Sequence, residues 1–179
     1  MKATGIVRRI DDLGRVVIPK EIRRTMRIRE GDPLEIYTSR DGEVIFKKYS
    51  LMGGVEDFAA QLCETMSRST GAICAVTDRD TVIAVAGGAK RELLGKRISA
   101  QLEQIMENRR MYQYDGQNQP VPVSDSSDRL MTAVAAPILS EGDLLGLVLF
   151  IGDGQSASGD AEYKLAQTIA AFLGRHMES

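Results

Sequence analysis

The spacing of apolar residues changes near residue 50 and divides the chain into two parts. Before residue 50 the apolar runs are short and alternate with polar residues, whereas beyond it apolar side chains recur at spacings of three and four. The segment Ser-Leu-Met-Gly-Gly at residues 50–54 separates the two patterns and is typical of a loop. We therefore predict an N-terminal domain over residues 1–50, a connecting helix over residues 51–70 and a second domain over residues 71–179.

Short strands and one short helix are predicted for the N-terminal domain. Asp-Asp-Leu-Gly separates the strands of a first pair, and Ser-Arg-Asp-Gly separates those of a second. Pro19 is expected to open a helix that continues to about Met26. The predicted strands are residues 4–10, 15–18, 34–38 and 43–48. A domain of this size buries too little apolar surface to be stable alone, so we expect it to be built from two chains.

An antiparallel sheet with helices packed on it is predicted for the rest of the chain. Residues 55–66 have the pattern of an amphipathic helix, and a final helix is expected over residues 158–177. Between them we predict strands at residues 72–76, 81–86, 110–114, 131–139 and 144–151, with a largely helical stretch at residues 92–108. This order of elements favours an α+β sandwich.

The final helix has more apolar positions than one sheet requires. One stripe holds Ala161, Leu165, Thr168 and Phe172, and the other holds Ala166, Ala170, Leu173 and Met177. A helix that covers its own sheet with one stripe still presents the other to a partner. We therefore predict that the second domains pair through their helices and join two N-terminal dimers into a tetramer. The residues assigned to this interface are Phe58, Leu62, Leu173 and Met177.

Positive charge is concentrated in the N-terminal domain, although the whole chain carries a net charge of -2. Residues 1–50 hold 12 Lys and Arg against 8 Asp and Glu, whereas residues 51–179 hold 11 against 17. Arginine dominates the basic cluster and suits bidentate contacts with phosphate and guanine. Within the predicted helix, Ile22 and Met26 share one face, so that Arg23, Arg24 and Arg27 are expected to face solvent or a ligand.

Residues for catalysis or metal binding are not found in this sequence. The one histidine, His176, has no second histidine with which to bind a metal, and Cys63 and Cys74 are expected to be buried thiols. Leu-Gly-Lys-Arg at residues 94–97 lacks the glycine and the hydroxyl that a phosphate-binding loop needs. We therefore predict no enzyme activity, no catalytic residue and no metal site. Apolar runs too short to cross a bilayer also favour a cytoplasmic protein without membrane contact.

The amino-acid sequence of the first domain resembles that of a known family. Residues 13–26, followed by Ile28, Gly31-Asp32 and residues 34–36, resemble the AbrB-type swapped-hairpin DNA-binding domain. The resemblance implies an all-β fold in which two chains exchange hairpins to form an interleaved dimer on double-stranded DNA. It implies DNA contacts by Arg8, Arg15, Arg23 and Arg24, with Lys2 and Arg9 as further phosphate contacts. The residue pattern alone selects Arg15, Arg23 and Arg24 and leaves the choice between Arg8 and Arg9 open.

Beyond residue 55 the chain more loosely resembles AbrB-type transition-state regulators that carry a C-terminal GAF-like domain. The resemblance implies a nucleoid-associated activator and repressor of sporulation genes. It assigns no cofactor, leaves open an unidentified small-molecule ligand of the GAF-like domain, and identifies no ligand-binding residue. The alternative is an antitoxin-type DNA-binding autoregulator whose C-terminal region binds a protein partner. Residues 55–179 read as a folded domain, whereas such regions are usually short and disordered.

Overall fold

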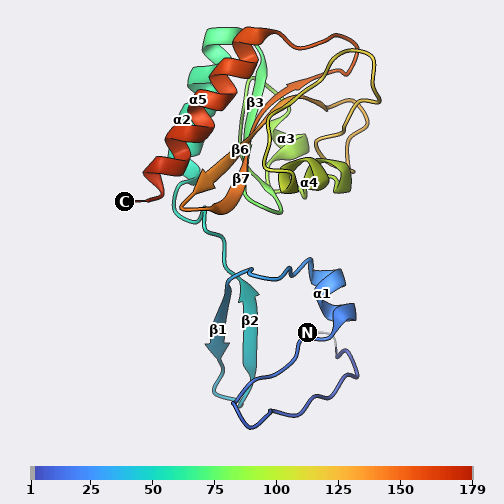
Figure 1. The fold of residues 1–179 in the computed structure, drawn as a ribbon, viewed down its shortest axis with the longest axis vertical. Coiled ribbons are helices and arrows are strands. Elements are labelled where there is room, and N and C mark those ends of the chain that lie inside the picture. Colours follow the sequence, from blue (N-terminus) through green and yellow to red (C-terminus); the bar gives the residue numbers. More distant parts are fainter. Residues whose placement is uncertain (1–2, 179) are drawn as a thin grey trace. The chain divides into compact units, whose positions relative to one another are not determined.

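The computed structural model describes residues 3–178 (Figure 1). The chain divides between Tyr49 and Ser50 into a first unit and a second unit, and each is described by itself. In chain order the elements are α1 (Lys20–Met26), β1 (Leu34–Thr38), β2 (Val44–Lys48), α2 (Glu56–Thr70), β3 (Ile73–Thr77), β4 (Val82–Ala86), α3 (Lys90–Leu93), α4 (Ala100–Glu107), β5 (Tyr112–Gln113), β6 (Met131–Ser140), β7 (Asp143–Gly152) and α5 (Asp160–His176). No helix of the described residues is long and apolar enough to cross a membrane.

Within residues 3–49, the first unit contains one short helix and one β-hairpin. As predicted, α1 begins after Pro19, and it ends where Arg27 adopts a left-handed conformation with φ +50°. Strands β1 and β2 pair antiparallel from Leu34↔Lys48 to Thr38↔Val44, also as predicted. The Lys48 ammonium donates a hydrogen bond of 2.8 Å to the Arg27 carbonyl, so that the end of α1 is fixed to β2.

The prediction of strands at residues 4–10 and 15–18 is wrong for the single chain. Both segments lack strand structure, and β1 and β2 form a sheet of two strands. Only the turn between the segments forms, with the Asp11 amide donating to the Arg15 carbonyl at 3.0 Å. A strand exists only where a neighbour accepts and donates its backbone hydrogen bonds. Without that neighbour these segments leave apolar side chains in solvent, and Val7 is 86% exposed.

The second unit is an antiparallel sheet between two layers of helices, which confirms the predicted α+β sandwich. The strand order is β4-β3-β7-β6-β5. Figure 1 shows α2 and α5 on one side of the sheet and α3 and α4 on the other. Strand β7 supplies both cores by alternation, because Val148 and Phe150 pack toward α2 and α5 while Leu147 and Leu149 pack toward α3 and α4.

Two predicted segments differ from the observed ones. The helix expected to connect the domains, α2, belongs to the second unit, because Ala59, Cys63 and Met66 are buried in its core. The helical stretch predicted at residues 92–108 is divided into α3 and α4, since Gly95 adopts φ +75° between them. Ser99 then caps α4, and its hydroxyl accepts a hydrogen bond of 3.0 Å from the Leu102 amide.

Candidate nucleic-acid interface

The helix α1 presents two of the predicted DNA-contacting arginines to solvent. Arg23 and Arg24 are exposed, and no residue of the helix is buried. The helix is held at its ends, where the Arg23 amide donates to the Pro19 carbonyl at 2.9 Å and the Ile28 amide to the Arg23 carbonyl at 2.8 Å. On the opposite face Ile22 is half-buried but Met26 is 49% exposed, so one chain only partly covers the apolar side of the helix.

Arg15 is positioned by the turn that Asp11 organises. One carboxylate oxygen of Asp11 accepts hydrogen bonds from the Leu13 amide at 3.0 Å and the Arg15 amide at 2.8 Å. The other accepts from Nε of Arg15 at 3.1 Å, while the Arg15 side chain stays 68% exposed. Gly14 completes the turn with φ +77°, a conformation that favours glycine. The turn therefore holds the guanidinium in place and leaves it open to solvent.

The remaining predicted contacts lie at the N-terminal end of the chain. Arg8 and Arg9 are both exposed, in a segment without regular structure. Neighbouring side chains of an extended segment point to opposite sides, so only one of the two is expected to share a face with any given partner. The structure places both without selecting one. Lys2 lies outside the described residues.

Three basic residues of the first unit have structural roles. Arg27, which was expected to face solvent or a ligand, ends α1 in a left-handed conformation and is half-buried. Asp32 is 4% exposed and accepts a hydrogen bond of 2.9 Å from the Arg29 amide. The Lys48 ammonium lies 3.7 Å from the same carboxylate. Sequence reasoning missed this role of Asp32, although its place within the Gly31-Asp32 part of the motif was a signal.

The outer faces of α2 and α5 form a second candidate surface. Phe58, Leu62 and Met177 are half-buried, and they pack against the core with part of their surface open. The assignment of Leu173 to an interface is wrong, because this side chain is 0% exposed within its own domain. Its neighbour Phe172, which the sequence did not assign to an interface, is 50% exposed.

Aromatic rings join α2 to α5 on this surface, which we call the helical face and define by Phe58, Leu62, Phe172 and His176. The Phe58 ring lies with its centroid 5.9 Å from that of Phe172 and 4.6 Å from that of His176. The rings of Phe172 and His176 are stacked at 6.5 Å. The single histidine is therefore part of an aromatic cluster.

The two cysteines are free and buried, as predicted. Burial raises the pKa of the Cys63 thiol to about 12, and the nearby Cys74 adds to the effect. Burial likewise raises the pKa of Cys74 to about 12. Because thiols react as thiolates, neither residue is suited to nucleophilic or redox chemistry at neutral pH.

Comparison with known proteins identifies the family. The family model described as "Stage V sporulation protein T C-terminal, transcription factor" matches residues 54–178. Stage V sporulation protein T of Bacillus subtilis (strain 168) is 47% identical over 178 residues, which are 99% of this chain and 99% of that protein. The chain belongs to the stage V sporulation protein T family. Its members are transcription factors, which agrees with the prediction that this chain is not an enzyme.

The first unit has relatives of its own. Residues 7–51 match the model described as "Antidote-toxin recognition MazE, bacterial antitoxin". Transition state regulatory protein AbrB of Bacillus subtilis (strain 168) is 63% identical over 49 residues, which are 27% of this chain and 50% of that protein. The chain is thus a transcription factor of this family with an AbrB-like DNA-recognition domain at its N-terminus.

The second unit has the α+β architecture that was predicted, with one five-stranded antiparallel sheet between two layers of helices. A type II free methionine-R-sulfoxide reductase from Thermoplasma acidophilum matches with a TM-score of 0.53, covering 69% of this chain and 94% of that protein. Sequence identity to it is 11%, so the similarity concerns the fold alone.

Proposed function

We propose that this protein binds operator DNA through a dimer of first units, with Arg8, Arg15, Arg23 and Arg24 as the principal contacts. Lys2 and Arg9 add phosphate contacts. The observation that carries the proposal is the exposure of Arg8, Arg15, Arg23 and Arg24, in the half of the chain that holds the excess positive charge. Phosphate contacts position such a protein on DNA, and arginine contacts to guanine edges select the sequence.

The proposed dimer is interleaved, because the two chains exchange hairpins. The first hairpin is the predicted strand pair of residues 4–10 and 15–18, which each chain contributes to the other. Exposed apolar side chains along residues 6–17 support this arrangement, since pairing between two chains would bury them and complete the missing strands. The most exposed are Val7, Ile10, Leu13 and Val17. Residues 1–50 expressed alone should form a dimer whose thermal stability rises with protein concentration. A monomeric fragment that unfolds cooperatively would contradict the interleaved fold.

Single arginine substitutions test the DNA interface. We expect Arg23→Ala, Arg24→Ala and Arg15→Ala each to weaken binding by at least about 30-fold, because each change removes two contacts per dimer at about 1–3 kcal/mol each. Fluorescence anisotropy on a fragment recovered by mapping the protein's sites in its host genome measures the loss. Loss of a phosphate contact should also make the slope of log K against log salt concentration less negative, by about 0.9 per contact.

Arg40→Ala is the matched control, because Arg40 is exposed in the turn between β1 and β2 and is not assigned to DNA. This variant should bind as the unchanged protein does. Equal affinities of the Arg23, Arg24 and Arg40 variants would refute the assigned DNA face. Sedimentation of each variant separates a lost contact from a lost oligomer.

The second unit is proposed to link dimers into a tetramer through the helical face and to bind a small molecule that alters DNA affinity. Two linked DNA-binding heads bind paired sites with avidity, and this suits a nucleoid-associated protein that activates some sporulation genes and represses others. The aromatic cluster supports the tetramer, because Phe172 and His176 are exposed and Phe58 is half-buried between them and the core. Expression profiling of a deletion strain would separate activated genes from repressed ones.

A second candidate function is that of an antitoxin-type autoregulator, which the match of residues 7–51 to the MazE model favours. The second unit argues against this function. It has two packed cores, one on each face of its sheet, whereas such an antitoxin carries a toxin-binding segment in that part of the chain. Affinity purification from the host that recovers a small toxin in stoichiometric amount would support the antitoxin.

A further inference from the structure

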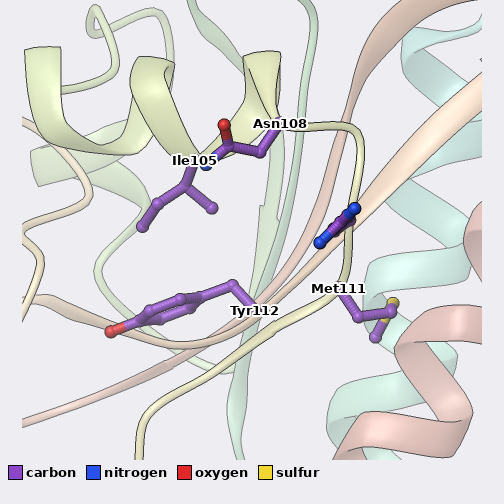
Figure 2. A pocket seen from close by; sticks show the side chains of 5 residues that line it. Ile105, Asn108, Met111 and Tyr112 are labelled. Carbon is purple, nitrogen blue, oxygen red and sulfur yellow. The ribbon is translucent and has the colours of Figure 1, made fainter.

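A pocket of about 490 Å³ lies in the second unit where α4 ends and β5 begins. Its walls are formed by Ile105, Asn108, Arg110, Met111 and Tyr112. Figure 2 shows Ile105 and Tyr112 extending toward the same space, with Asn108 above them at the end of α4. Met111 points the other way, toward the core on the side of α2 and α5. The volume falls in the range of about 300–1,000 Å³ that small-molecule sites occupy.

The pocket depends on a sharp turn between α4 and β5. Asn108 ends the helix, and Arg109 then adopts a left-handed conformation with φ +53°. The Arg109 guanidinium donates a hydrogen bond of 2.7 Å to the Gly142 carbonyl, which ties the turn to the β6–β7 connection. Tyr112 pairs with Ala135 of β6 immediately afterwards. The backbone on both sides of Arg110 is therefore held in place, which brings this exposed side chain to the pocket.

The charge at the pocket comes from Arg110. This side chain makes no ion pair and no side-chain hydrogen bond with any of residues 3–178, and the pocket walls contain no acidic residue. Glu107 at the end of α4 is already engaged by Arg79 at 2.9 Å. Burial, with smaller effects of Asp115 and Tyr114, raises the pKa of Tyr112, whose hydroxyl therefore stays neutral at physiological pH. The pocket is thus a cationic site with an aromatic and an aliphatic wall.

The layer between the sheet and the helices α3 and α4 is packed with apolar side chains. Leu93, Ile98, Leu102 and Met106 fill the layer between the sheet and α3 and α4, and each is 0% exposed. The pocket lies outside this packed layer, beside the short strand β5.

We propose that this pocket binds a small carboxylate that carries an apolar or aromatic body. The Arg110 guanidinium matches a carboxylate with two parallel hydrogen bonds, and the Asn108 amide offers a further donor. Ile105 and the Tyr112 ring pack against the apolar body. The proposal rests on the proposed small-molecule binding of the second unit and adds to it a place and a chemical class. It does not require that binding change the affinity for DNA.

Ligand-observed NMR on the full-length chain tests the site with phenylacetate as the probe. We expect saturable binding with a Kd in the millimolar range or tighter, and binding of phenylacetamide that is weaker by roughly 10-fold or more, because the amide lacks the charge. Arg110→Gln should weaken phenylacetate to the same degree. Ile105→Ala should weaken it less, through loss of one apolar wall.

Arg91→Gln is the control, because Arg91 is an exposed arginine of α3 that does not line the pocket. Thermal melts of all variants establish that they are folded. No saturation by phenylacetate up to about 20 mM, equal binding of phenylacetamide, or equal binding by Arg110→Gln would each overturn the proposal. Displacement by inorganic phosphate at equal concentration would also overturn it, since phosphate makes no use of the apolar walls.

Anisotropy with operator DNA, measured with and without phenylacetate, separates this site from the proposed regulation. Binding through Arg110 with unchanged DNA affinity supports the pocket and refutes the sensing role for this class of ligand. Changed DNA affinity that persists in Arg110→Gln refutes the pocket and leaves the sensing role in place.

Discussion

Two neighbouring residues of α5 allow a sharp test of the proposed tetramer. Phe172 is 50% exposed on the helical face, whereas Leu173 is 0% exposed in the core. Aromatic side chains bury roughly 150–250 Å² when fully covered, so about 100 Å² of Phe172 is left for a partner. At about 25 cal/mol per Å², burial of that surface contributes about 2.5 kcal/mol per copy. A two-fold interface holds two copies and gains about 5 kcal/mol at most.

Phe172→Ala should therefore weaken the association of dimers by at least about 10-fold and by no more than roughly 10³- to 10⁴-fold. Sedimentation velocity over a concentration series measures the change. Binding to DNA with two sites should fall along with the tetramer, because avidity is lost, while binding to a single short site should stay the same. The contact of the Phe58 and Phe172 rings at 5.9 Å is lost as well, so the variant unit should melt slightly lower.

Leu173→Ala is the counterpart, in which the side chain is removed from the core and not from the surface. It should cost about 2–5 kcal/mol of unfolding free energy and lower the melting temperature far more than Phe172→Ala does. Gln167→Ala, on the exposed side of α5, should change neither the association of dimers nor the unfolding free energy. The reasoning is refuted if Phe172→Ala leaves the association constant unchanged, or if the unchanged protein is a dimer at micromolar concentration.

Two further changes probe the second unit. Gly174→Ala should destabilise it by at least about 2 kcal/mol in chemical denaturation, because the added Cβ would lie 2.1 Å from the Leu139 carbonyl oxygen; stability equal to that of Gln167→Ala would contradict the observed approach of α5 to β6. The raised pKa values of Cys63 and Cys74, about 12, mean that the folded state keeps both thiols protonated while the unfolded state loses its protons near pH 9. Unfolding free energy should therefore fall as pH rises from about 9 to 12, and it should fall less steeply in Cys63→Ala. Rapid labelling of either thiol by a maleimide at pH 7 in the folded protein would contradict their burial.

Local signals in the sequence were sufficient for most elements of the fold. Pro19 marks the start of α1, and the Asp41-Gly42 turn marks the hairpin of β1 and β2. The strands predicted before α1 failed for a different reason. An alternating pattern reports that a segment fits a sheet, but the hydrogen bonds come from a neighbour. One chain does not supply that neighbour for residues 4–10 and 15–18. The local pattern therefore does not determine whether these segments form strands.

The choice between the two stripes of α5 was wrong because hydrophobicity alone does not say which stripe faces the sheet. Size is the better guide here. Ala166, Ala170 and Gly174 follow one another at intervals of four, and these small side chains let the helix approach β6 closely. The larger Phe172 lies outside that strip and stays exposed. On α5 the row of small residues therefore marks the packed face, which the number of apolar residues does not do.

Some basic residues of the first unit are open to DNA and others have a structural role. A count of charges does not separate the two groups. Arg15 is paired with Asp11 on the surface, where an ion pair is worth about 0–1 kcal/mol, so a DNA phosphate can replace the carboxylate at little cost. The Asp32 side chain is 4% exposed and lies within 4.0 Å of the cationic groups of Lys48 and Arg29, so removal of either cation would leave a largely buried carboxylate without its charge partner. We therefore expect Lys48 and Arg29 to stay with Asp32 in the proposed DNA complex. The positions of the two carboxylates thus decide which cations are available to the phosphates, and Arg15 belongs to that set while Lys48 does not.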